Sequence, residues 1–311
     1  MTPEQSPSVS VIDPISPAIE RVKLMLFKPF NLGRWFTIGF CAWLAFLGRG
    51  GGGGGGGNFR FPTEHDQAGF QHAKEFFIDN LSWLIPAAII GVILIIVLWL
   101  VFTWLSSRGR FMFLHCVATN RAEVKVPWAK FQQHGNSLFL FRVVLGLIGF
   151  AAIGLPCLLA VGLIAMTVAG NGLGVTTVLG IVMIGLIIVA ISIILFLVGK
   201  FTMDFVVPIM FLRTTSCTAG WRKFLTILSV NKARFALYIL FQIVIAIVIG
   251  AIISMGFCIG CCLCCASLLL LVPYIGTVLI LPLLVFKRAY SLFYLRQFGD
   301  DFDCLAPQIG A

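Results

Sequence analysis

Charged side chains are scarce in this sequence. Only 11% of its 311 residues are Asp, Glu, Lys or Arg, against about a quarter in an ordinary soluble domain. A soluble fold of this length could bury a large core, but it would still need a charged surface. Hydrophobic residues make up 59% of the chain, and the mean hydropathy is +1.03. The apolar surplus must therefore face lipid, which excludes an ordinary soluble fold and predicts an integral membrane protein.

Acidic residues are the rarest charges, and familiar catalytic motifs are missing as well. Asp204 is the only acidic residue between Glu123 and Asp300. The apolar segments carry no paired carboxylates, and the chain has no H-E-x-x-H, G-x-S-x-G or G-x-x-x-x-G-K-[ST] pattern. We therefore expect no catalytic residues, no metal site and no cofactor. These missing motifs argue against an enzyme.

Long apolar runs, by contrast, are abundant. A helix needs about 20 mostly apolar residues to cross the hydrocarbon core. The sequence predicts an all-α integral membrane protein with six transmembrane helices. The expected spans are Trp35–Leu47 (extended back through Phe30), Trp83–Leu105, about Leu138–Val168, about Val175–Val198, Phe235 to about Phe257, and about Leu263–Phe286.

The last two spans lie in one apolar block, so the turn between them must be placed inside it. We predict this turn near residues 256–262, where glycines and cysteines cluster. Pro273 and Pro282 then fall inside the sixth helix and should kink it.

One membrane domain accounts for nearly the whole chain. We expect a disordered segment at residues 1–16, the six-span domain at 17–298 and a tail at 299–311. Residues 48–80 should form an external loop whose Gly run is a flexible coil. A short surface helix is expected in the later half of that loop.

The basic residues are distributed unevenly between the loops. With six spans, only Arg49, Arg60 and Lys74 of the 22 Lys and Arg residues fall on the side opposite the termini. Cytoplasmic loops carry the Lys/Arg excess in membrane proteins. Both termini are therefore predicted to be cytoplasmic. The net charge of +10 is explained by topology, so no nucleic-acid partner is expected.

Two segments of the chain look alike. PWAKFQQHGNSLFLF (127–141) and GWRKFLTILSVNKARFALY (220–238) share W-x-K-F, an Asn and a Phe before a span. Each follows an amphipathic stretch, and a looser version lies near the N-terminus. We predict three repeats, each an interfacial amphipathic helix plus a two-span hairpin. Interfacial anchors would be Trp128, Lys130, Trp221 and Lys223, although membrane loops in general carry such residues.

Three polar residues at apolar segments are candidates for function. Lys200 and Asp204 are four residues apart, so they share a helical face and can pair. An ionisable residue in a membrane segment is a functional-site hypothesis, but an ion pair that ends the hydrophobic stretch is the favoured interpretation. Gln242 lies within the fifth span. It could line a polar path, but a structural bond to another helix is favoured.

The ten cysteines do not form the framework of a small secreted domain. Cys258, Cys261, Cys262 and Cys265 would share one face of a helix. One continuous helix cannot wrap four thiolates around an ion, so we favour a close helix contact over a metal site. A disulfide at the outer face stays open.

Several quoted segments resemble a known group of proteins. SRGRFMFLHCV with VPWAKF, DFVVPIMF with GWRKF, and the opening PFNLGRWFTIGFCAWLAFLG resemble bacterial six-span membrane proteins related to the membrane domain of some glycerophosphodiester phosphodiesterases. The resemblance covers about residues 17–298. It implies a helical fold in a bacterial cytoplasmic (inner) membrane. The phosphodiesterase domain is absent, so the resemblance carries no activity.

Three classes of function follow from these observations. A non-enzymatic membrane scaffold or accessory protein is favoured, with the lipid bilayer, a homo-oligomer or another membrane protein as partner. A lipid-handling protein at the cytoplasmic headgroup layer is the first alternative, and a transporter or channel is the second. Convergence of Asp204, Gln242 and Asn136 on one hydrated cavity would favour transport. A basic, laterally open groove would favour a lipid-handling protein, and the absence of a cavity would favour a scaffold.

Overall fold

The computed structural model describes residues 9–47, 80–167, 174–262 and 272–305. Within these ranges the ordered elements are all helical. The prediction of an all-α fold is therefore confirmed for the part of the chain that the structure describes.

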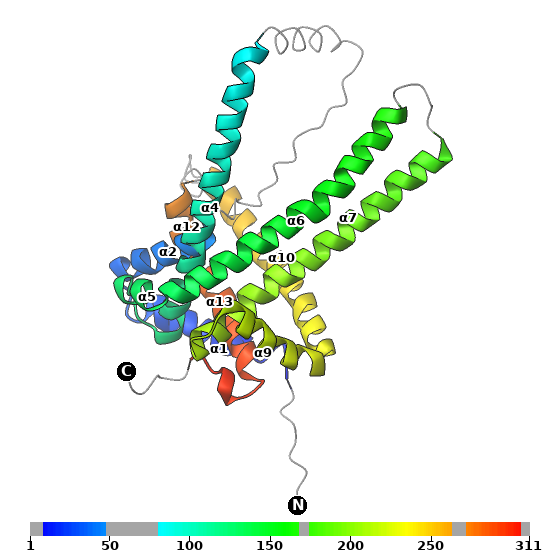
Figure 1. The fold of residues 1–311 in the computed structure, drawn as a ribbon. Helices are drawn as coiled ribbons and strands as arrows, with labels where there is room; N and C mark the ends of the chain where they lie inside the picture. The colour runs from blue at the N-terminus through cyan, green and yellow to red at the C-terminus, as the bar shows by residue number, and fades with distance from the viewer. Residues whose placement is uncertain (1–8, 48–79, 168–173, 263–271, 306–311) are drawn as a thin grey trace, which may run out of the picture.

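Within the described residues, four helices are long and apolar enough to cross a membrane. Their most apolar stretches are almost unburied, with 0% buried in the first three and 17% in the fourth. In Figure 1 these helices rise from a common base. Their exposed apolar surface is compatible with membrane insertion. The helices are α4 (Leu81–Thr119), α6 (Gln132–Met166), α7 (Val175–Phe201) continued by η4 (Thr202–Val206) and α8 (Val207–Arg213), and α10 (Lys232–Cys262).

The first expected span is shorter than predicted. Helix α2 (Leu32–Phe46) has 15 residues and is about 22 Å long, whereas the hydrocarbon core is about 30 Å thick. The expected extension back through Phe30 is wrong. The helix begins at Leu32 because the Asn31 side chain caps it, accepting a hydrogen bond from the Arg34 N–H at 3.2 Å.

The expected turn at residues 256–262 is also wrong, because α10 continues through Cys262. Glycines are tolerated there, and nothing in the apolar sequence stops the helix. The chain then forms α12 (Pro273–Leu279) and α13 (Leu281–Arg296). Both prolines lie in the first turn of a helix, where a missing N–H costs little, rather than inside one kinked helix. Residues 263–271, where the sixth span was expected to begin, lie outside the described residues.

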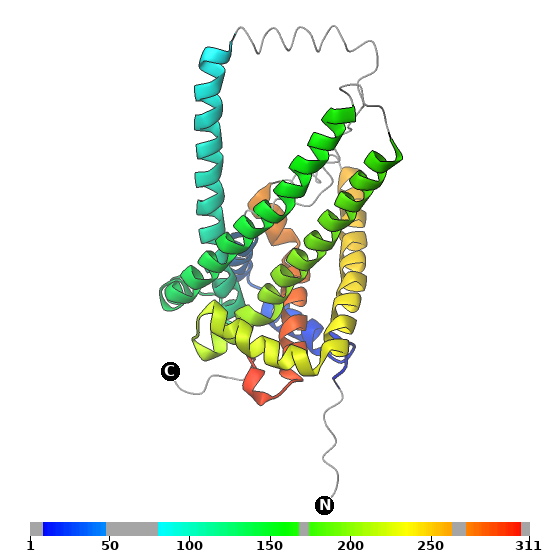
Figure 2. The same cartoon turned by 45° about the vertical axis from the view of Figure 1, so that its right-hand side comes forward.

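The amphipathic stretches that precede the two repeated segments are not separate interfacial helices. Residues 106–119 are the end of α4, and residues 207–213 form α8, which continues α7 through η4. Phe111, Leu114 and Ile209 of these stretches are fully buried, so their apolar face meets protein and not the headgroup layer. Short helices then lead into the next spans. These are α5 (Lys125–Lys130) and α9 (Cys217–Val230), the latter lying across the base in Figure 2.

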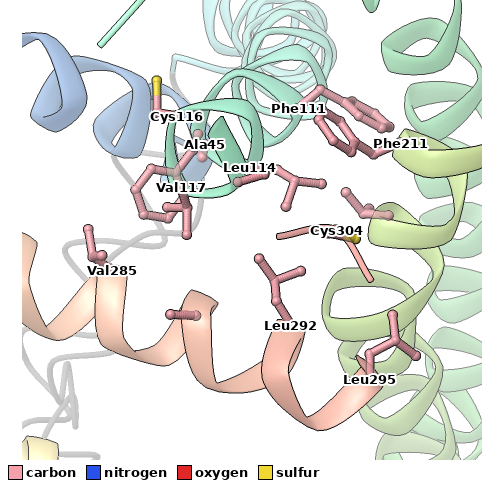
Figure 3. Packing of buried hydrophobic residues seen from close by; sticks show 14 of the residues in the cluster. Ala45, Phe111, Leu114, Cys116, Val117, Phe211, Val285, Leu292, Leu295 and Cys304 are labelled. Carbon is pink, nitrogen blue, oxygen red and sulfur yellow. The ribbon is translucent and has the colours of Figure 1, made fainter. Parts of the chain in front are cut away.

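The buried core lies at the base, where the basic ends of the long helices meet. Helix α13 passes through it and packs against α1 (Ile15–Val22), α4 and η4. Figure 3 shows Val285 and Leu292 of α13 turned toward Leu114 and Val117 of α4. Each such side chain contributes roughly 1.5–3 kcal/mol on burial. The core therefore holds the helix ends together, while the distal halves expose most of their apolar side chains.

Part of the N-terminal segment expected to be disordered is ordered on this base. The Ser10 N–H donates to the Gln297 side chain at 2.7 Å, and Gln297 donates back to the Ser10 carbonyl at 3.0 Å. Tyr290 donates to the Val11 carbonyl at 2.8 Å. At the other end, the short turn η5 (Asp300–Phe302) follows α13 and buries Phe302. The external loop at 48–80, with its expected surface helix, lies outside the described residues up to residue 79.

Candidate functional site

A cavity of about 430 Å³ lies where α2, α4, α7 with η4, α10 and α13 meet. Its lining combines two kinds of surface. One is apolar and comes mainly from α10, with further side chains from α2, α4, α7 and α13. The other is polar and strongly basic, and consists of Arg110, Lys200, Asp204, Gln242, Lys287 and Arg288.

Asp204 lies in a local widening of the long helix. Residues 202–206 form a π-helical turn, and the Val207 N–H donates to the Thr202 carbonyl, five residues back. Pro208 follows in the first turn of α8 and has no N–H to donate to the carbonyl of Asp204. The wider turn accommodates this missing bond. Such turns occur often at functional sites because they change the direction of side chains.

The Asp204 carboxylate is held in a ring of hydrogen bonds between two helices. The Lys200 ammonium lies 2.6 Å from Asp204 Oδ2, so the pair predicted from their spacing is present. The Tyr238 hydroxyl of α10 donates to the same oxygen at 3.0 Å. Gln242 closes the ring, since it accepts from Lys200 at 3.2 Å and donates to Tyr238 at 2.9 Å. Gln242 therefore makes the interhelical bond expected of it, from a 5% exposed side chain beside the cavity.

Two arginines reach the residue before Asp204 from other helices. Arg288 of α13 donates to the Met203 carbonyl at 2.6 Å, and Arg110 of α4 contacts the Met203 sulfur. Desolvation lowers the pKa of Arg288, and the nearby Asp204 carboxylate opposes this change. Arginine stays charged under these conditions. The cavity thus gathers positive charge around one carboxylate.

Three of these charged residues occupy corresponding positions in their helices. Arg110 precedes the α4 cap Asn120 (φ 58°) by ten residues, and Asp204 precedes the α8 cap Thr214 (φ 47°) by ten. Arg288 lies eleven residues before Gly299 (φ 136°), just beyond α13. Helices α4 and α8 end directly at their left-handed residues, whereas α13 ends at Arg296, three residues before Gly299. Each of the three helices thus carries its charge into the cavity between two and three turns before its end.

The apolar wall of the cavity belongs to the exposed surface of the long helices. Phe196 of α7 is 60% exposed, and Ile243 and Ile247 of α10 are 53% and 66% exposed. Side chains that line a cavity and also face outward connect it with the surroundings of the helices. The apolar wall is therefore continuous with the exposed apolar surface that is compatible with membrane insertion.

The predicted interfacial anchors do not belong to the cavity. Trp128 packs edge-on against Trp104 with a 6.1 Å ring separation, and the Arg108 guanidinium lies over both rings. Asn136 accepts hydrogen bonds from Trp104 and Arg108, and it does not line the cavity. Lys130 is exposed.

The second pair of anchors lies around α9. Trp221 is half-buried and packs on Phe141 and Phe224, while Lys223 is exposed. These tryptophans therefore pack largely within the protein at the base.

Sequence reasoning missed Arg110, Lys287 and Arg288, which it assigned only to membrane orientation. The sequence signal that could have identified two of them is their distance from the ends of their helices. Arg110 and Arg288 precede the ends of their helices by nearly the same distance as Asp204 does, but those ends were not predicted.

Metal binding finds no geometric support in the described part of the chain, where no group of three or more His, Cys, Asp or Glu could hold an ion. The cysteine cluster is not covered by this statement. Cys258 is exposed on α10, but nothing is described for the side chains of Cys261, Cys262 and Cys265.

Comparison with known proteins places the chain in a family without assigning an activity. The chain belongs to a family of unknown function (DUF7544), which it matches over residues 9–285. No curated protein and no solved structure matches it. The function must therefore be argued from the site.

Proposed function

We propose that this protein binds an anionic phospholipid in the cavity between α4, α7, α10 and α13. One observation carries the proposal: a basic pole and a lipid-facing apolar wall line the same space. Among the residues that the structure describes, four cations and a single carboxylate line the cavity. Basic pockets between membrane helices suit anionic headgroups, and exposed residues such as Ile247 offer a surface for the acyl chains.

The volume and the chemistry of the cavity agree with this ligand. Ligand sites commonly measure about 300–1,000 Å³ and combine apolar walls with a few placed polar groups. Transferring cations from water into a partly buried site is unfavourable unless anions accompany them. An excess of Arg and Lys over Asp in such a site is therefore best explained by an anionic partner.

This proposal is preferred to a purely structural scaffold and to a transporter. A scaffold needs no basic cavity at the meeting point of its helices. A transport path would be supported by convergence of Asp204, Gln242 and Asn136 on one cavity, but Asn136 bonds to Trp104 and Arg108 outside the cavity. Of these three residues, only Asp204 and Gln242 line it.

The proposal includes a topology and an internal repeat. We place the base, with both termini, on the cytoplasmic side of a bacterial inner membrane, because the Lys/Arg excess lies there. The cavity would then lie at the depth of the inner headgroups. The matched positions of Arg110, Asp204 and Arg288 support three related units. The six-span count and the resemblance to phosphodiesterase membrane domains remain predictions.

The test is lipid binding by the purified full chain, measured by native mass spectrometry after delipidation in mild detergent. We expect phosphatidylglycerol to bind at least about tenfold more tightly than phosphatidylcholine. Lys287→Gln should weaken phosphatidylglycerol binding by about tenfold, since it removes a charge-assisted contact.

The matched control removes the same charge from a residue outside the cavity. Lys223 is exposed on α9, so Lys223→Gln should bind phosphatidylglycerol like the unaltered protein. The two variants should unfold at similar temperatures. Equal loss in both variants, or no preference for the anionic lipid, would contradict the proposal.

A further inference from the structure

A carboxylate such as Asp204 is unfavourable in a site that binds only phosphate. A carboxylate repels phosphate oxygens, and this repulsion is strongest where water is excluded. Asp204 is nevertheless the one carboxylate among the described residues that line the cavity, and it is 9% exposed. Its presence calls for an explanation beyond the binding of an anion.

The contacts of Asp204 leave one of its oxygens available. Lys200 and Tyr238 both reach Oδ2, at 2.6 and 3.0 Å. No hydrogen bond to Oδ1 is found from the residues that the structure describes. A carboxylate oxygen can accept about two hydrogen bonds. The contacts with Lys200 and Tyr238 therefore account for Oδ2 only. Oδ1 can still accept a hydrogen bond, and it belongs to a residue that lines the cavity.

We propose that Asp204 selects a phospholipid with a hydroxylated headgroup by accepting a hydrogen bond from a headgroup hydroxyl on Oδ1. This inference rests on the proposed function and adds the headgroup class to it. The phosphodiester anion meets the basic residues Arg110, Lys287 and Arg288, and the hydroxyl meets Asp204. The acyl chains lie along the apolar wall.

The surrounding charges favour a hydroxyl donor over an ammonium donor. An ethanolamine ammonium placed at Asp204 would lie among the same cations that bind the phosphate, and like charges at this range repel. A hydroxyl carries no charge and meets no such repulsion. A choline headgroup has no donor at all. The favoured ligand class is therefore an anionic phospholipid with a polyol headgroup.

The decisive comparison uses two lipids that differ only in headgroup hydroxyls. Phosphatidylglycerol and phosphatidylpropanol, with identical acyl chains, have the same charge and the same number of headgroup carbons. We expect the full-length protein to prefer phosphatidylglycerol by about tenfold or more in competitive native mass spectrometry, because a hydrogen bond to a buried carboxylate is strong.

A paired substitution then attributes the preference to Asp204. Removing Asp204 alone would leave Lys200 without its carboxylate, so the test variant is the double substitution Lys200→Met with Asp204→Leu. It removes both charges and, unlike Asn, leucine leaves no side-chain oxygen to accept the hydroxyl. Replacing both members of a buried pair is often tolerated. The preference for phosphatidylglycerol should fall to within about threefold. Circular dichroism on heating confirms that the variant is folded.

The outcomes separate this inference from the proposed function. Equal binding of the two lipids by the unaltered protein would overturn the role of Asp204 and leave anionic-lipid binding intact. An unchanged preference in a folded double variant would overturn it as well. Binding of neither lipid would overturn the proposed function itself. Water-soluble glycerophosphoglycerol at the same concentration should not compete, and competition would overturn the assignment to a lipid.

Discussion

Individual arginines anchor the basic end of α4. The last carbonyls of a helix have no partner within the helix and need donors from elsewhere. Arg21 supplies them, donating to the Val117 carbonyl at 3.0 and 2.7 Å and to the Ala118 carbonyl at 2.6 Å. Arg34 donates to both the carbonyl and the side chain of Asn120. Their charge also complements the negative end of the helix dipole. Residues near the N-terminus thus hold the helix that carries Arg110.

At the same scale, Cys304 should be chemically inert in the folded protein. Burial raises the pKa of its thiol to about 12, and the side chain is 5% exposed. Only about one molecule in 10⁴ would carry the reactive thiolate at pH 8. In a background without other cysteines, we expect Cys304 to react with iodoacetamide at least about a hundredfold more slowly than an exposed cysteine introduced by Lys223→Cys. Equal rates would show that the C-terminal segment does not pack on the base.

Helices α2 and α4 approach each other closely at one glycine. A Cβ atom at Gly109 would lie 2.6 Å from the backbone of Leu44 and Ala45, which cannot move aside as a side-chain tip can. The hydroxyl of Ser106, one turn earlier, donates to the Ala45 carbonyl at 2.9 Å. This contact holds α2 beside the cavity, where Ala45 and Phe46 form part of the wall.

We therefore expect Gly109→Ala to destabilise the protein by about 1–3 kcal/mol, as overpacking does. The readout is the free energy of unfolding in mixed micelles titrated with denaturing detergent. The matched control is Gly185→Ala in α7, where an added Cβ meets nothing within 4 Å. It should be neutral or slightly stabilising, because alanine favours a helix over glycine. A similar loss in both variants would argue against the close contact.

The whole molecule divides into a packed base and free apolar helices. Buried side chains gather at the base, while exposed ones such as Leu158, Leu186 and Ile247 cover the distal halves of the helices. Helices α6 and α7 lie against each other even there, where a Cβ added at Gly180 would lie 3.4 Å from Leu163. The apolar surface that these halves still expose is compatible with hydrocarbon, in which each helix satisfies its own backbone. The cavity lies between the two regions, so its lining combines charged side chains with exposed apolar ones.

This division predicts a definite labelling pattern in intact cells. Arg121 and Thr214 lie at the base, whereas Gly174 lies at the distal end of α7. With the base in the cytoplasm, a membrane-impermeant maleimide should label Gly174→Cys in intact cells, and Arg121→Cys and Thr214→Cys only after permeabilisation. Labelling of Arg121→Cys from outside would invert the proposed orientation. Labelling of Arg121→Cys and Thr214→Cys from opposite sides would exclude the topology altogether.

The local sequence by itself determined the long apolar helices and one ion pair of this protein. Uninterrupted apolar runs can be hidden only in hydrocarbon, so the long helices were predictable, and a spacing of four residues sufficed to pair Lys200 with Asp204. Where helices end was less accessible, because the end of α4 depends on Arg21 and Arg34 from a distant segment. The cavity required the tertiary structure. Arg110 and Arg288 reach Met203 across 93 and 85 residues of chain, and no local rule specifies such a meeting. Packing of three helix ends against one another gathers charges that are far apart in the sequence around one cavity, the cavity that we propose binds an anionic lipid.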